Sequence, residues 1–168
     1  MEVFEAMRTM LAVRRFRDQR VSENIVRKIV ESAHLTGSAG NKQPWRFIAV
    51  EDRESLNHLG AVATSGPYIA TAAFAVVVLV EKTPFAVSDA SRAAQSMMLT
   101  GWSEGIGSNW VGFGGFEDIK ALLGIPAELD VLAILPFGYP AAAIGRGKKN
   151  RKPLSEVAFR ERFGTPFA

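Results

Sequence analysis

Hydrophobic and polar positions follow two different periods along this chain of 168 residues. In "SENIVRKIVESAHL", Ser22 can cap a helix, and one helical face then carries the apolar residues Ile25, Val26, Ile29, Val30 and Ala33. The run at residues 74–80, "FAVVVLV", is instead apolar at every position and rich in β-branched side chains. It predicts a central strand buried on both faces of a sheet.

The remaining patterns predict two N-terminal helices followed by alternating strands and helices. The further strands are expected at residues 45–51, 108–113 and 131–138, and the further helices at residues 53–63, 89–104 and 116–124. The segment from Ala143 onward has no core of its own and predicts an arm. We therefore expect one domain over residues 1–168, of the α+β or three-layer α/β type, with helices flanking a central mixed or antiparallel sheet of four or five strands.

The helix expected after Ser88 is unusually apolar. In "DASRAAQSMMLTGWSE", small and large apolar residues surround more than one narrow stripe, up to Gly105 at its end. Such a helix contacts more than one neighbour. A subunit interface would explain the pattern.

Composition and charge exclude several classes of protein. The hydrophobic content of 48% is sufficient for a core, and the formal net charge of +3 indicates neither nucleic acid nor membrane as a partner. The absence of Cys excludes disulfides and thiolate chemistry. No signal peptide is evident, and the longest apolar run, residues 72–80, is far shorter than the roughly 20 residues of a membrane helix. We expect a soluble, cytoplasmic protein.

Common catalytic motifs are missing. His34 and His58 are the only histidines, and their spacing is not that of a zinc site. The chain has no "GxSxG", "GIGSNWVG" lacks the third glycine of a dinucleotide fingerprint, and "GRGKKN" lacks the spacing of a P-loop. We expect no metal, and hydrolysis has no support.

Two clusters of cations and one polar loop remain as candidate sites. The cations that could hold a phosphate are Arg14, Arg15 and Arg17 near one end, and Lys148, Lys149, Arg151 and Lys152 near the other. The loop "SAGNKQPW" offers the donors and acceptors of Ser38, Asn41 and Gln43, beside small residues that let a flat ligand approach. A solvated face for the cations and an ordinary turn for the loop remain open alternatives.

The ordered combination of these segments resembles the flavin-dependent nitroreductase family over essentially the whole chain. The segment "VRRFRDQRVSENIVRKIVESAHLTGSAGNKQPWRFIAVED" is similar to the family's opening Arg-x-Phe, helix and Asn-x-Gln-Pro-Trp loop. "DASRAAQSMMLTGWSEGIGSNWVGFGGFEDIKALLGIP" is similar to its central helix and Gly-x-Gly strand. "ILPFGYPA" and "KNRKPLSEV" resemble its Gly-Tyr-Pro turn and its phosphate-binding Lys-x-Arg.

The resemblance implies a homodimer that binds FMN at its interface, exchanges C-terminal arms and is reduced by NADH or NADPH in a ping-pong cycle. Nitroaromatics, quinones or a related small molecule would be the acceptor. The residues matching the family's flavin-binding positions are Arg14, Ser38, Asn41, Gln43, Gly114, Gly115, Lys149 and Arg151. The flavin carries the hydride itself, so the protein supplies orientation and electrostatics and needs no catalytic side chain.

The chain departs from the family pattern at two places. Met10, Leu11 and Ala12 stand where relatives have basic residues and a serine, so phosphate ligands are lost unless Arg8 or Arg15 substitutes. Only "EKTPFAVS" separates the central strand from the next helix, where many relatives insert a substrate cover. A shorter cover predicts a more open flavin.

Two alternatives to the reductase follow from the same residues. The first is a reductive dehalogenase or flavin-fragmenting enzyme on the same scaffold. The second is a non-enzymatic module that binds anions through its basic clusters, although "GRGKKNRK" contains no aromatic residue for stacking on bases. The aromatic residues of the arm, Phe159, Phe163 and Phe167, recur every four positions and fit either a short helix or an arm that grips the partner.

Overall fold

An antiparallel sheet forms the centre of the fold. The computed structural model describes residues 1–112, 116–143 and 149–167. Within these residues the strand order is β1-β2-β4-β3, and every neighbouring pair is antiparallel. The strands are β1 (Trp45–Val50), β2 (Phe74–Glu81), β3 (Gly107–Ser108) and β4 (Leu129–Gly138). The expected α+β architecture is confirmed.

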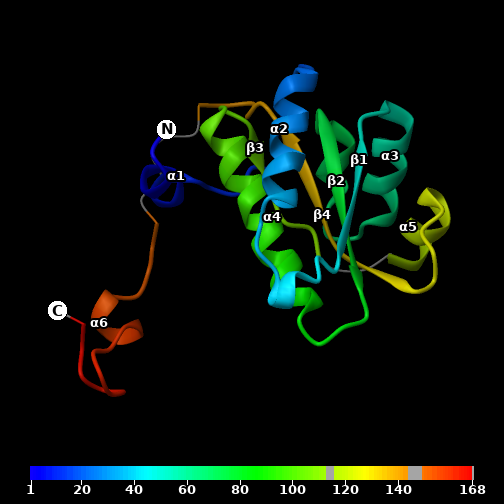
Figure 1. The fold of residues 1–168 in the computed structure, drawn as a ribbon. Helices are drawn as coiled ribbons and strands as arrows, with labels where there is room; N and C mark the ends of the chain where they lie inside the picture. Colours follow the sequence, from blue (N-terminus) through cyan, green and yellow to red (C-terminus); the bar gives the residue numbers. More distant parts are fainter. Residues whose placement is uncertain (113–115, 144–148, 168) are drawn as a thin grey trace.

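Helices cover both faces of this sheet, with α2 and α4 on one face and α3 and α5 on the other (Figure 1). The α-helices are α1 (Val3–Thr9), α2 (Glu23–His34), α3 (Arg53–Val62), α4 (Ala86–Ser103), α5 (Phe116–Leu123) and α6 (Leu154–Val157). Two 3₁₀ turns, η1 (Ala39–Asn41) and η2 (Pro67–Thr71), precede β1 and β2. No helix in the described part of the chain is long and apolar enough to cross a membrane.

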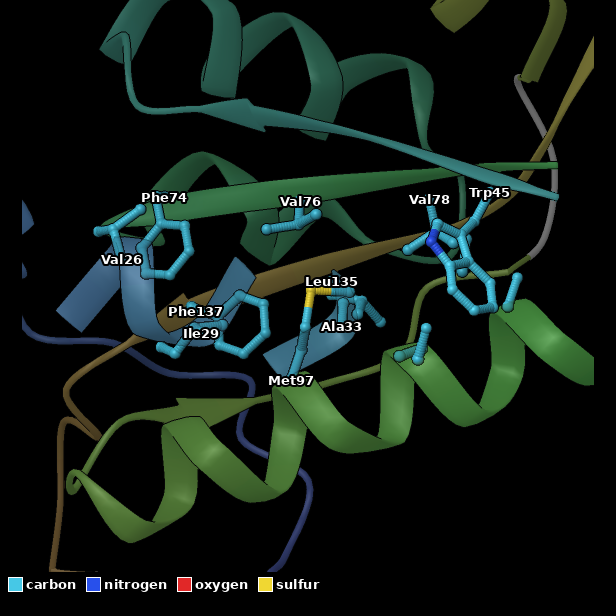
Figure 2. Close-up of a cluster of buried hydrophobic side chains, with 14 of the residues drawn as sticks. Val26, Ile29, Ala33, Trp45, Phe74, Val76, Val78, Met97, Leu135 and Phe137 are labelled. Carbon is cyan, nitrogen blue, oxygen red and sulfur yellow. The ribbon is translucent and has the colours of Figure 1, made fainter. Parts of the chain in front are cut away.

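The side chains of β2 divide the interior into two cores. One set faces α2 and α4 and comprises Phe74, Val76, Val78 and Val80 (Figure 2). The other set faces α3, η2 and α5 and comprises Ala75, Val77 and Leu79. In the first core the rings of Phe74 and Phe137 stack with their centroids 4.9 Å apart. The uninterrupted apolar run in the sequence therefore identified a strand with two buried faces.

The helix after the central strand begins earlier than the sequence predicts. Its N-cap is Phe85, and the Ser88 hydroxyl donates to the Phe85 carbonyl within the first turn. The helix begins early because the turn at residues 83–85 already supplies its first bond, from the Ala86 N–H to the Thr83 carbonyl. Ser88 is thus not the cap.

The strand expected at residues 108–113 is also shorter. Only Gly107 and Ser108 pair as a strand, and Val111 forms an isolated bridge with Ile134. Between them the Asn109 side chain turns inward and donates to the hydroxyl of Tyr68, which interrupts the ladder. Phe113 lies outside the described residues.

Asp52 caps α3 and gives a pH-dependent prediction. Its carboxylate accepts the Ser55 N–H at 2.8 Å and the Ser55 hydroxyl at 2.9 Å, and these bonds lower the pKa of Asp52. A pKa lowered by folding contributes stability above the ordinary pKa, which is lost as pH falls through the lowered value. We expect Asp52→Ala to lower the free energy of unfolding at pH 7, with a difference that shrinks below about pH 4. Urea unfolding at pH 7 and in acid measures this; an equal difference at both would exclude a contribution from the charge.

The C-terminal arm extends away from the sheet and its helices (Figure 1). Its described side chains are exposed apart from Lys149, Ala158 and Phe159. The expectation of an arm without a core is confirmed, but the three phenylalanines do not share a helix, because α6 ends before the first of them. Instead the chain folds back through an antiparallel β-bridge between Phe159 and Pro166. The ring of Phe163 packs on that of Phe159, with the two centroids 4.6 Å apart.

Candidate functional site

The segment around Arg14 lies along the edge of the sheet. The Val13 N–H donates to the Ser108 carbonyl at 2.8 Å, and the Ala141 N–H donates to the Arg15 carbonyl at 2.9 Å. Val13 and Phe16 are buried, whereas Arg14 and Arg15 are exposed. The backbone bonds and the burial of Val13 and Phe16 therefore hold the segment against the sheet and leave Arg14 and Arg15 on the solvent side.

Two glycines allow this segment to lie so close. A Cβ at Gly107 would lie 2.4 Å from the Val13 side chain, and a Cβ at Gly138 would lie 2.9 Å from that of Phe16. Any larger residue at either position would displace the segment. Gly107 and Gly138 thus allow the segment that carries Arg14 to lie against the sheet.

Arg14 lines a cavity of about 330 Å³ together with the residues at 12–15 and 140–143. A second cavity of about 650 Å³ lies alongside, between α1, the end of α4 and the same Pro140 turn. The two share Pro140, Ala142 and Ala143. Helix α1 is held there by the Trp102 indole N–H, which donates to the Thr9 hydroxyl at 3.0 Å.

The cations of the arm approach α1. The Lys149 ammonium donates to the Met7 carbonyl, and Arg151 is exposed, with its guanidinium donating to the adjacent Asn150 carbonyl at 3.1 Å. Arg14, Lys149 and Arg151 form no ion pair within the part of the chain that the structure describes. Their positive charges are not offset by a contacting carboxylate, which suits the binding of an anion.

The loop at residues 36–44 is a tight, strained turn. The Asn41 N–H donates to the Ser38 carbonyl at 3.0 Å, and the Gln43 N–H donates to the Ser38 hydroxyl at 2.9 Å. Gly40, Asn41 and Gln43 all have left-handed backbone, with φ of 56°, 54° and 50°. Left-handed backbone costs a residue with a side chain on the order of 1–3 kcal/mol. Gly and Asn adopt this conformation in ordinary turns too, so the left-handed Gln43 is the more unusual residue and makes the loop a candidate functional site.

Contacts from two elements, α4 and β2, hold the strained loop. The Thr36 and Ser96 hydroxyls share a hydrogen bond of 2.9 Å, and the Glu81 N–H donates to the Pro44 carbonyl at 2.9 Å. The Ala39 N–H donates to the carboxylate of Asp89 at 3.0 Å. The amide side chains of Asn41 and Gln43 contact one another at 3.2 Å and are exposed.

The prediction from sequence missed Asp89 as a contributor to this site. There it is only the first residue of the helix expected at residues 89–104. Its spacing gives a clue, since Ala86, Ala90 and Ala93 on the same helical face are all buried. An aspartate on an otherwise apolar face requires a partner from another segment.

Those predicted site residues that the structure describes do not converge within one chain. The loop is attached to Asp89 in the first turns of α4, whereas α1 and the Arg14 segment lie by Trp102 and Ser108 at its other end (Figure 1). Asp89 and Trp102 are 13 residues apart, which is about 20 Å along a helix. The cavity beside Arg14 contains no residue of the loop. Gly114 and Gly115 lie outside the described residues.

The histidines give no support for a metal site. His34 and His58 are both exposed and lie on α2 and α3. Among the residues with described positions, no group of three or more His, Asp or Glu side chains could hold a metal ion. The candidate chemistry therefore rests on the cations and the loop.

A family model supplies the decisive comparison. The model described as the nitroreductase family matches residues 11–84 and 68–139. The chain belongs to the nitroreductase family. This confirms the family and the oxidoreductase class that the sequence predicts.

Named relatives agree with this assignment. The chain is 35% identical over 150 residues to a protein of Methanothermobacter thermautotrophicus assigned as an NADH dehydrogenase/NAD(P)H nitroreductase, with 84% of this chain and 78% of the relative covered. It is 25% identical over 174 residues to the iodotyrosine deiodinase of Thermotoga neapolitana, with 88% and 91% covered. An FMN-dependent nitroreductase structure from Clostridium difficile R20291 has a TM-score of 0.80 at 23% identity, covering 98% of this chain and 99% of that one.

The resemblance to the nitroreductase family places Met10, Leu11 and Ala12 where its members are expected to have basic residues and a serine. Of the two candidate substitutes, Arg8 is engaged by Glu5 through two hydrogen bonds of 2.9 Å, and this partner raises the pKa of Arg8. Arg15 is exposed, lines the Arg14 cavity and has no carboxylate partner among the described residues. The geometry favours Arg15 over Arg8.

Proposed function

We propose that the protein is an FMN-dependent oxidoreductase that uses NADH or NADPH to reduce nitroaromatics, quinones or a related small acceptor. The observation that carries this proposal is the set of exposed or half-buried cations, Arg14, Lys149 and Arg151, without carboxylate partners in the described chain. They occupy the positions that match the family's flavin ligands. The names of the relatives support FMN as the flavin and NAD(P)H as the reductant.

The cations and amides of the candidate site are the types of group that bind the phosphate and the ring of FMN. Lys149 and Arg151 would hold the phosphate, which needs charge-assisted donors, and Arg14 would face the pyrimidine edge of the ring, where a cation favours negative charge. The amides of Asn41 and Gln43 offer both donors and acceptors to a planar ring. When bound, FMN supplies the hydride transfer, and the residues of this chain hold and orient it.

The proposed enzyme is a homodimer whose partner supplies the second wall of each site. The loop and the Arg14 segment lie at opposite ends of α4, so the loop of one protomer can meet only the Arg14 segment of another. Exposed apolar side chains on α1 and on the arm are suited to this contact, namely Val3, Phe4, Met7, Leu154, Val157 and Phe163. Exchange of the arms would bury them, as the resemblance implies.

The test is the absorption spectrum of the purified protein, followed by anaerobic addition of NADH or NADPH. We expect flavin bands, release of FMN on denaturation and bleaching by the nicotinamide. Reoxidation by a nitroaromatic or a quinone would then complete the cycle. A protein that stays colourless after incubation with FMN and gel filtration would contradict the proposal.

A second candidate function is reductive dehalogenation, which the similarity to an iodotyrosine deiodinase favours. The short connection between β2 and α4 provides no evident substrate cover, which favours the reductase. Mixing the reduced protein with iodotyrosine under anaerobic conditions separates the two functions. Release of iodide at a higher rate than nitroaromatic reduction would make reductive dehalogenation the better-supported function.

A further inference from the structure

Asp89 is the one buried carboxylate in the part of the chain that the structure describes. Its residue is 1% exposed, although it lies only three residues after the start of α4. A charged group removed from water requires partners, and those partners indicate its role. The flavin contacts proposed above do not involve it.

Both oxygens of Asp89 are occupied. Oδ2 accepts the Ala39 N–H at 3.0 Å, and Oδ1 accepts from the guanidinium of Arg92, whose side chain remains 57% exposed. The carboxylate thus joins α4 to the loop at residues 36–44, while Arg92 offsets its charge from the solvent side. Capping of its own helix would not require a bond to a residue 50 positions away.

Ala39 is the residue at which the strained turn begins. It is the first residue of η1, and its carbonyl accepts the Lys42 N–H at 3.2 Å. The left-handed residues Gly40, Asn41 and Gln43 lie within the next four positions. Strained backbone of this kind persists only where surrounding contacts over-determine it. Loss of the bond to Asp89 would leave the Ala39 N–H without this acceptor and free the turn to relax.

We propose that Asp89 is a positioning residue that fixes the loop in the conformation presenting Asn41 and Gln43 to the flavin. This inference rests on the proposed function. Asp89 acts through the loop and does not itself contact the ring. The carboxylate of one protomer would accordingly set the affinity of the flavin site shared with the second protomer.

The test compares Asp89→Ala with Asp89→Asn, whose amide oxygen can still accept the Ala39 N–H. We expect Asp89→Ala to speed hydrogen exchange at residues 39–43 in the flavin-free protein and to weaken FMN binding by about tenfold, while Asp89→Asn stays within about threefold of the wild type. Asp118→Ala, which removes an exposed aspartate on α5, is the matched control and should change neither. If Asp89→Ala does not fold, Asp89→Ser is used, which is polar but too short to reach Ala39.

The outcomes separate the inference from the proposed function. Wild-type protein that binds no FMN would contradict both, although local exchange would still report the contact with Ala39. Wild-type and Asp89→Ala proteins of equal FMN affinity would overturn the inference alone. If Asp89→Ala speeds hydrogen exchange over the whole chain but leaves the FMN affinity of the folded protein unchanged, Asp89 has only a structural role, and this result would also overturn the inference.

Discussion

Replacing Gly107 with alanine is expected to lower the free energy of unfolding by about 1–3 kcal/mol and to weaken FMN binding about tenfold. The added Cβ would lie 2.4 Å from the Val13 side chain, a distance that forces Val13 to move. Val13 is buried and bonded through its N–H to the Ser108 carbonyl, so the movement would shift the adjacent Arg14. Urea unfolding and fluorescence titration with FMN measure the two effects.

A compensating variant tests the cause of this loss. In the double variant Gly107→Ala/Val13→Ala the clash is relieved, and we expect the two substitutions to be less costly together than the sum of their separate effects. Gly37→Ala is the matched control for the unfolding measurement alone, because a Cβ there meets nothing within 4 Å but the residue belongs to the loop at residues 36–44. Additive effects of the two substitutions would show that Gly107 does not act through Val13.

The sequence predicted best where local pattern and tertiary environment agree. The face of α2 and the two-sided strand β2 follow directly from the spacing of their apolar residues. The end of α5 also follows from local sequence, because Gly124 comes directly after the helix and adopts the left-handed backbone, with φ of 62°, that commonly ends helices. The strand after α4 was predicted too long because the inward turn of Asn109 depends on Tyr68, about 40 residues earlier in the chain.

The sequence indicates candidate site residues by their type but not their arrangement in space. Arg14, Asn41 and Lys149 were singled out by residue type and by resemblance, since cations and amides are the groups that hold a phosphorylated flavin. The role of Asp89 depends on a contact with Ala39 in another element, which no local period encodes. Likewise, only the structure places the loop and the cations at opposite ends of α4. That separation is the physical reason to expect a site shared between two protomers.

The variant Lys149→Ala/Arg151→Ala is expected to lose most of its preference for FMN over riboflavin, which lacks the phosphate. Two charge-assisted contacts to a phosphate are together worth roughly 3 kcal/mol, so FMN affinity should fall roughly a hundredfold while riboflavin affinity stays the same. The effect should be large here because Met10, Leu11 and Ala12 supply no charged donor. Fluorescence titration with both flavins measures the preference.

A control of equal charge distinguishes local contacts from a general electrostatic effect. Arg27→Ala/Arg162→Ala removes two exposed cations that match none of the family's flavin-binding positions, and both flavins should bind it as they bind the wild type. Long-range attraction would instead weaken FMN binding equally in the two double variants and would fade with added salt. An equal loss of riboflavin and FMN affinity in Lys149→Ala/Arg151→Ala would mean that the arm shapes the whole site. The phosphate would then be held by Arg15, the remaining cation beside Arg14 in its cavity.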